Sequence, residues 1–146
     1  MEPRLNIEVS VPEAYKAVLT LTGIAAHVKL TPIQKELIKI RASQVNGCVF
    51  CIDMHTKAAL RIGETPQRIF LLNAWRETDH FSPAEKALLA LVEEVTLIHQ
   101  HGASDVVYAN AVDHFGAEQL PLIMVAIVSI NAWNRIAVMS RTQVPR

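Results

Sequence analysis

The sequence predicts an all-α fold, a single-domain bundle of about six or seven helices formed by residues 1–146. Three observations carry this prediction. At three places proline follows a threonine or a serine, which is typical of a helix start, because the hydroxyl caps the helix and the first turn does not need the N–H that proline lacks. Apolar residues recur with a period near 3.6, and no segment alternates regularly enough to predict a strand.

The helix starts are the clearest local signals. Thr31, Thr65 and Ser82 each precede a proline, so we expect each of them at an N-cap. Ser82 is followed three residues later by Glu85, and this spacing predicts a capping box, in which the two residues bond to each other's backbone N–H groups.

Helix ends are marked by glycine. Asn46-Gly47 predicts a turn between the second and third helices, and Gly63 is expected just beyond the end of the third. With these boundaries, the predicted helices span residues 11–27, 33–45, 48–62, 66–76, 83–100, 105–115 and 118–139.

The last predicted helix is unusually apolar, with Pro121 in its first turn and residues 122–128 apolar on every side. Such a helix must be buried all round, within the subunit or between subunits. The apolar stretch 120–133 is too short and too interrupted to predict a membrane span. Because 51% of the chain is hydrophobic and only 19% charged, we expect a homo-oligomer. We favour a trimer or a hexamer, a choice that the composition itself does not decide.

The charge balance argues against two classes of partner. Fourteen Lys and Arg residues balance fourteen Asp and Glu residues, without runs of one sign, so we expect no binding to nucleic acid or to an anionic membrane. The N-terminal residues do not resemble a secretory signal. With two cysteines only three positions apart, the chain does not resemble a secreted disulfide scaffold, and we expect a cytoplasmic protein.

The cysteine pair is the main chemical signal. Cys48 and Cys51 open a predicted helix, where unpaired N–H groups and the helix dipole favour the thiolate. His55 follows Cys51 by four residues and therefore lies on the same helix face, where it can take up the thiol proton. Glu36, on the preceding helix, is a candidate for fixing the tautomer of His55.

Other interpretations of these residues remain open. The cysteines could form half of a zinc site with His55 and Glu36, or pack as inert apolar residues. Glu36 alone would more often be a solvated helix residue, and Glu93 with Glu94 is expected on a solvated helix face. We assign no metal role to His99 and His101, because residues two apart do not share a helix face.

Residues 36–56 carry a longer pattern: a glutamate, the lead-in Ser-Gln-Val-Asn-Gly, two cysteines and a histidine. This stretch closely resembles the core signature of the alkylhydroperoxidase D-like branch of the carboxymuconolactone decarboxylase family. Residues 130–135 also resemble the last helix of that family. The decarboxylase branch lacks the cysteine pair, so the resemblance is to the redox branch.

The resemblance implies a role for each site residue. Cys51 would be the peroxidatic thiolate, Cys48 the resolving and more accessible cysteine, and His55 with Glu36 a proton relay. It implies no bound cofactor and no metal, and it implies an external dithiol reductant, for example of the lipoyl type. The chain departs from the archetype at Phe50, where the hydroperoxidase has a second histidine.

The leading hypothesis is therefore a thiol-dependent reductase of hydroperoxides, in which oxidised Cys51 condenses with Cys48. Two alternatives stand beside it: a non-catalytic, redox-responsive oligomer, and a general disulfide oxidoreductase.

Overall fold

The computed structural model describes residues 2–145, which form helices and connecting segments and contain no strand. The all-α prediction is thus confirmed. The elements are α1 (Ile7–Ser10), α2 (Pro12–Ala25), α3 (Pro32–Asn46), α4 (Val49–Arg61), α5 (Pro66–Leu71), the 3₁₀ helix η1 (Leu72–Glu77), α6 (Pro83–Thr96), α7 (Ile98–His101), α8 (Asp105–Phe115) and α9 (Leu120–Ser140).

Each predicted helix has a counterpart, but the described residues contain more helices than predicted. The range 66–76 divides between Leu71 and Leu72 into α5 and η1, and η1 itself is kinked at Ala74, which leaves helical geometry at φ −120° and ψ 32°. The range 83–100 divides into α6 and α7 at Leu97, which has φ −101° and ψ 32°. The one-turn helix α1 was not predicted, and the side chain of Asn6 caps it.

The predicted N-caps are confirmed. The hydroxyls of Thr31, Thr65 and Ser82 each accept a hydrogen bond from a backbone N–H in the first turn of the helix that follows. Ser82 and Glu85 form the predicted capping box, and Thr31 forms another with Gln34. These reciprocal bonds satisfy helix-end N–H groups that would otherwise lack partners.

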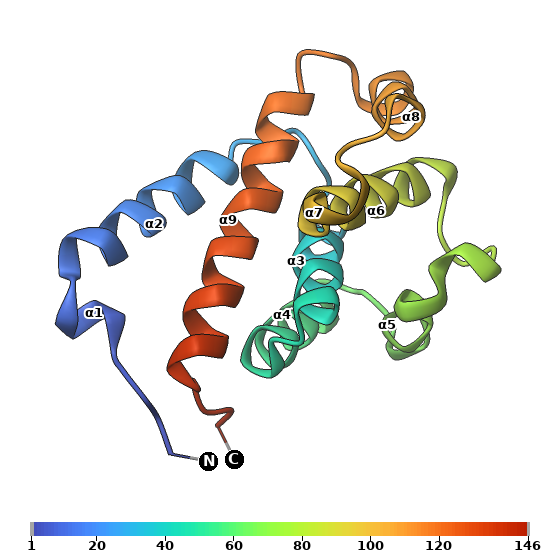
Figure 1. The fold of residues 1–146 in the computed structure, drawn as a ribbon. Helices are drawn as coiled ribbons and strands as arrows, with labels where there is room; N and C mark the ends of the chain where they lie inside the picture. Colours follow the sequence, from blue (N-terminus) through green and yellow to red (C-terminus); the bar gives the residue numbers. More distant parts are fainter. Residues whose placement is uncertain (1, 146) are drawn as a thin grey trace.

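A tight turn joins α3 to α4 and places the two helices side by side (Figure 1). Gly47 ends α3 at φ 66°, a left-handed conformation that glycine adopts without steric cost. The N–H of Cys48 then donates to Ser43 O over 2.9 Å, and Cys48 becomes the N-cap of α4. The turn therefore brings the start of α4 against the end of α3.

Helix α9 is the central element, in contact with α2, α3, α4, α6 and α8. It lies between α2 on one side and α3 and α4 on the other (Figure 1). Ile123, Ile127 and Ile130 anchor it in the larger of the buried apolar clusters. Pro121 lies in its first turn, as predicted.

The structure bears on two predictions about this helix. The helix has 21 residues, and an 18-residue window within it has a mean hydropathy of 1.7, so by length and composition it could cross a membrane, a test that core helices also pass; the expectation of a stretch too short and too interrupted for a span is wrong. Complete burial was expected within the subunit or between subunits, and the first of these alternatives is wrong, because residues exposed within the chain include Met124, Val128, Val138 and Met139. They belong to the face that the neighbouring helices leave uncovered.

Candidate active site

Cys48 and Cys51 form a disulfide at the start of α4, with their Cα atoms 5.4 Å apart. Cys48 is the N-cap, and the N–H of Cys51 lies 3.4 Å from the Cys48 sulfur. The predicted placement of the pair at a helix N-terminus is confirmed. There the free N–H groups and the positive end of the helix dipole favour a thiolate when the bond is reduced.

The expected difference in cysteine accessibility is wrong. Cys48 is 1% exposed and Cys51 is 2% exposed, so both are buried, and they pack with Ala137 of α9 and with Phe50. The local sequence offered no sign of the contact with α9, because Ala137 lies almost ninety positions later in the chain.

Glu36 and His55 meet across the α3–α4 interface. The carboxylate Oε2 of Glu36 lies 2.9 Å from Nδ1 of His55, and both side chains are close to nine-tenths buried. Because an ionised carboxylate can only accept, Nδ1 carries the proton in this bond. Nε2 is then the ring nitrogen left for other proton transfers.

Lys39 extends this pair into a row of three groups and was missed at the sequence level. Its Nζ lies 2.7 Å from the other carboxylate oxygen of Glu36, one helical turn away. Burial by itself would raise the pKa of Glu36, but the hydrogen bonds and charges of His55 and Lys39 outweigh burial and hold this pKa below its usual value of 4.5. Glu36 is therefore ionised at neutral pH. The available signal was the i, i+3 spacing of Glu36 and Lys39.

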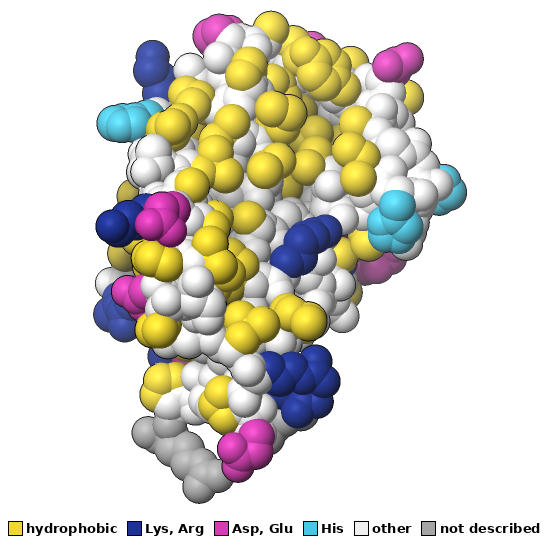
Figure 2. All heavy atoms as spheres, turned by 60° about the vertical axis from the view of Figure 1, so that its left-hand side comes forward, with side chains coloured by type: hydrophobic (Ala, Val, Ile, Leu, Met, Phe, Trp, Pro, Cys, Tyr) yellow, Lys and Arg dark blue, Asp and Glu magenta, His cyan; other side chains and the backbone are white. Residues whose placement is uncertain are grey.

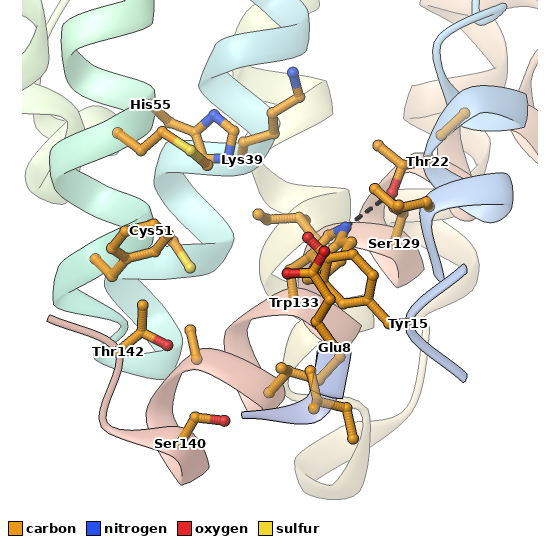
Figure 3. Close-up of a pocket in the computed structure, with 18 of the residues that line it drawn as sticks. Glu8, Tyr15, Thr22, Lys39, Cys51, His55, Ser129, Trp133, Ser140 and Thr142 are labelled. Carbon is orange, nitrogen blue, oxygen red and sulfur yellow. Dashed lines mark hydrogen bonds between the residues drawn. The ribbon is translucent and has the colours of Figure 1, made fainter. Parts of the chain in front are cut away.

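A cavity of about 720 Å³ opens beside these groups. Cys51, His55 and Lys39 line one side, and helices α1, α2 and α9 supply the opposite side. In Figure 3 the Cys51 sulfur is directed toward the space that separates α4 from Tyr15 and Trp133. The lining is largely apolar, so a bound molecule would be mostly shielded from water beside a reactive sulfur.

The far wall of this cavity is held together by hydrogen bonds between α2 and α9. The hydroxyl of Thr22 lies 2.9 Å from the hydroxyl of Ser129 and accepts the indole N–H of Trp133 over 2.8 Å (Figure 3). Tyr15 packs edge-on against Trp133, with ring centroids 5.3 Å apart. These contacts place α2 at a defined distance from α4.

The opposite face of α3 carries a separate polar cluster. Glu93 accepts hydrogen bonds from Arg41, from the indole of Trp75 and from Arg76, over 2.6–2.8 Å. The predicted solvated face for Glu93 is therefore wrong. Glu94 is also engaged, because its carboxylate accepts the N–H and the hydroxyl of Ser104 at the start of α8.

The zinc alternative receives no geometric support. Among residues 2–145, no three His, Cys, Asp or Glu side chains converge in a way that could hold a metal ion. The disulfide itself occupies the two sulfurs that a zinc site would need.

Comparisons with known proteins agree with the fold and with the family resemblance of the sequence. Residues 12–94 match the model of the carboxymuconolactone decarboxylase family. The chain is 42% identical over 138 residues to the uncharacterized protein YdfG of Bacillus subtilis, which covers 94% of each chain.

Solved structures give the same result. A protein of unknown function from Agrobacterium tumefaciens, described as a candidate antioxidant defence protein AhpD, superposes with a TM-score of 0.95 at 42% identity over 99% of both chains. The debrominase Bmp8 superposes with a TM-score of 0.76 at 17% identity, over 92% of this chain and 72% of that one. At 17% identity the likeness establishes a shared fold alone.

Proposed function

Because the chain belongs to the carboxymuconolactone decarboxylase family, in its alkylhydroperoxidase D-like branch, we propose that it is a thiol-dependent hydroperoxide reductase with an antioxidant role. One observation carries the proposal. Cys51, disulfide-bonded to Cys48, lines the same cavity as His55, whose ring is bonded to the buried Glu36. Thiol-based peroxide reduction needs a redox-active sulfur and an acid–base group beside the bound peroxide, and here a carboxylate–imidazole pair lies beside the same apolar cavity as the sulfur.

The proposed oxidation begins with the reduced pair. The Cys51 thiolate attacks the terminal oxygen of the peroxide, an S–O bond forms and the O–O bond breaks, and the departing alkoxide takes up a proton as an alcohol. The Cys48 sulfur then attacks the sulfenic acid on Cys51. The S–S bond forms and hydroxide leaves as water after protonation. Each turnover thus consumes two thiol protons and yields the disulfide.

In this scheme Glu36 and His55 handle protons. His55 takes the proton of the Cys51 thiol on Nε2, and the negative Glu36 stabilises the imidazolium that forms. The same imidazolium can protonate the departing oxygen. Phe50 stands where the archetype has a second histidine, so the proposed relay contains one histidine, His55, together with Glu36.

The reductant is proposed to be a dithiol, for example of the lipoyl type, supplied in the cytoplasm. Burial of both cysteines argues against a general disulfide oxidoreductase, because the disulfide of a folded protein substrate could not approach a sulfur that is 1–2% exposed. A peroxide or a slender thiol fits these surroundings better.

A homo-oligomer, trimeric or hexameric, is proposed to cover the exposed apolar face. Figure 2 shows hydrophobic side chains gathered over the side of the molecule formed by α2 and α9. On these two helices Leu19 and Ile24 of α2 and Met124 and Val128 of α9 are exposed. Exposed patches of this kind mark association surfaces. Light scattering at micromolar concentration should give a mass several times 16.2 kDa, and a clean monomer would refute the proposed association.

Turnover is the decisive test of the function. Purified protein is mixed with cumene hydroperoxide and excess dihydrolipoamide, and peroxide loss is followed beside the Cys51→Ser variant. A peroxidase consumes many equivalents of peroxide per chain, and the variant consumes none. Consumption that stops at one equivalent would instead support the redox-responsive, non-catalytic alternative.

A further inference from the structure

The two sulfurs of the disulfide line different cavities. Cys51 lines the large cavity that also contains His55 and Lys39. Cys48 lines a second cavity of about 450 Å³, which neither His55 nor Lys39 reaches. The walls of this second cavity are the start of α4, the end of α9 and the segment 141–144 that follows α9, which we call the C-terminal tail.

The two cavities adjoin each other. Four residues line both of them: Phe50, Ala137, Thr142 and Gln143. Phe50 and Ala137 pack directly against the buried cysteine pair. The tail turns back under the disulfide because Arg141 ends α9 in a left-handed conformation at φ 54°, and the N–H of Thr142 donates to Ala137 O over 3.0 Å.

From this arrangement we infer that the protein has two entrances: peroxide reaches Cys51 through the large cavity, and a thiol reductant reaches Cys48 through the separate cavity walled by the C-terminal tail. The oxidative half of the inference rests on the proposed function. The reductive half does not, because reduction of the disulfide can be measured on its own.

The chemistry of the second entrance follows from the sulfur that it offers. A reductant thiolate attacks the Cys48 sulfur, a mixed disulfide forms, and the Cys48–Cys51 bond breaks with its electron pair left on Cys51. Cys51 is a suitable leaving group because it lies among the free N–H groups of α4. A second thiol of the reductant then attacks the mixed disulfide and releases Cys48 as a thiol. One two-electron reduction of the protein thus oxidises one dithiol to a disulfide.

The lining of the second cavity indicates which kind of thiol can reach Cys48. Val49, Val138 and Val144 make most of the lining apolar, and Cys48, which shares this cavity with them, is only 1% exposed. The fitting reductant is therefore a small thiol, or a thiol on a slender carbon arm, because so little of Cys48 is accessible.

The test measures the two half-reactions separately, with dithiothreitol as the reductant probe and cumene hydroperoxide as the oxidant probe. Val138→Trp and Val144→Trp narrow the small cavity only, and Met54→Trp, the matched control, narrows the large cavity only. Disulfide reduction is followed on protein oxidised with diamide, by acid quench, alkylation and mass spectrometry. Thiol oxidation by peroxide is followed in the same way on reduced protein.

The inference predicts that each variant slows only the half-reaction that uses the cavity it narrows. Each valine variant should slow reduction by dithiothreitol by about tenfold or more, because exchange depends on access to the attacked sulfur, while peroxide oxidation stays within about twofold of wild type. Met54→Trp should slow peroxide oxidation by a similar factor and leave the rate of reduction by dithiothreitol within about twofold of wild type. Val144→Ala, which widens the small cavity, should accelerate reduction and provides an independent readout if a tryptophan variant folds poorly.

Two results would overturn the inference. If a valine variant slows both half-reactions equally, the sulfurs share one entrance. If neither valine variant slows reduction, the small cavity is not the route to Cys48. If wild type fails to react with peroxide, the proposed function falls, but the dependence of the reduction rate on Val138 and Val144 still decides the second entrance.

Discussion

Two glutamates on neighbouring helices show how the same side chain can serve chemistry in one place and stability in another. Glu36 and Glu93 are each 13% exposed at the side chain, and each has a pKa below its usual value of 4.5. In both cases burial would raise the pKa, and hydrogen-bond donors outweigh it.

The difference lies in the partners. Glu93 is bonded to the guanidinium groups of Arg41 and Arg76 and to the indole of Trp75, none of which exchanges a proton near neutral pH. Glu36 is bonded to His55, which can change its charge, beside a cavity and a cysteine pair. A low carboxyl pKa alone therefore does not identify a functional site, whereas a titratable partner facing a cavity does.

The largest expected loss of peroxide consumption follows from substitution of the two cysteines. Cys51→Ser should abolish peroxide consumption, because no thiolate remains to attack the peroxide. Cys48→Ser should allow one oxidation and then stall as a sulfenic acid, since no resolving thiol remains. Dimedone labelling with mass spectrometry checks the trapped species. Total loss in both variants without trapped sulfenic acid would contradict the assigned roles.

Substitution of His55 should give the second-largest loss of peroxide rate. His55→Ala should slow the reaction of Cys51 with peroxide by about 10²–10⁴-fold, the usual contribution of a positioned acid–base group. Glu36→Gln should give a smaller loss if Glu36 only orients His55, and a similar loss if it also carries protons. Because the two residues share one role, the double variant should lose less than the product of the single losses. Single-turnover rates measure all three.

Glu93→Gln should lower the stability of the protein and leave its peroxide rate unchanged. It removes a charge that accepts three hydrogen bonds, so the free energy of unfolding should fall by about 2 kcal/mol, and Tm by about 4–8 °C for a chain of this size. The peroxide rate of the variant below its melting range should match wild type. A loss of rate comparable to that of Glu36→Gln would remove the distinction between the two glutamates.

The contribution of Glu93 to the free energy of unfolding should disappear at acid pH. Its pKa is lower in the folded chain than its usual value of 4.5, so its contribution is complete above that value and disappears as pH falls through the folded-state pKa. The difference in unfolding free energy between wild type and Glu93→Gln should therefore shrink between about pH 6 and about pH 3. Urea titrations across this range test the sign, and a difference that grows toward acid would be contrary to it.

The smallest effect is expected at Lys39, which is one-third exposed at its side chain. Lys39→Met removes a cation from Glu36, so the Glu36 pKa should rise and the peroxide rate should change by only about two- to fivefold, since partly exposed ion pairs contribute little. The matched control is Lys57→Met, because Lys57 pairs with Asp53 on the same helix as His55 and outside the cavity lining.

Local features of this chain could be predicted from sequence, because they depend on residues close together. Thr31, Ser82 and Gly47 determine where helices begin and end through short-range hydrogen bonds and backbone geometry. The Asn46-Gly47 turn joins two helices whose lengths bring Glu36 to His55, so this pair could also be anticipated.

Features that depend on distant segments could not be predicted. The large cavity requires α2 to lie against α9, and the bonds from Thr22 to Ser129 and Trp133 join residues more than a hundred positions apart. The burial of Cys48 and its separate cavity depend on the tail beyond Arg141. Nothing in the local sequence around Cys48 indicates that the tail returns there.

The central claim, that the Glu36–His55 pair activates Cys51, is tested most directly by the pH dependence of Cys51 alkylation. In reduced protein carrying Cys48→Ser, the rate of alkylation is measured from acid to alkaline pH, alone and with His55→Ala, Glu36→Gln or Glu93→Gln. We predict that the pH of half-maximal rate moves upward with the first two substitutions and is unchanged with the third. Identical profiles in all four proteins would show that His55 and Glu36 do not act on the thiol, and would contradict the account.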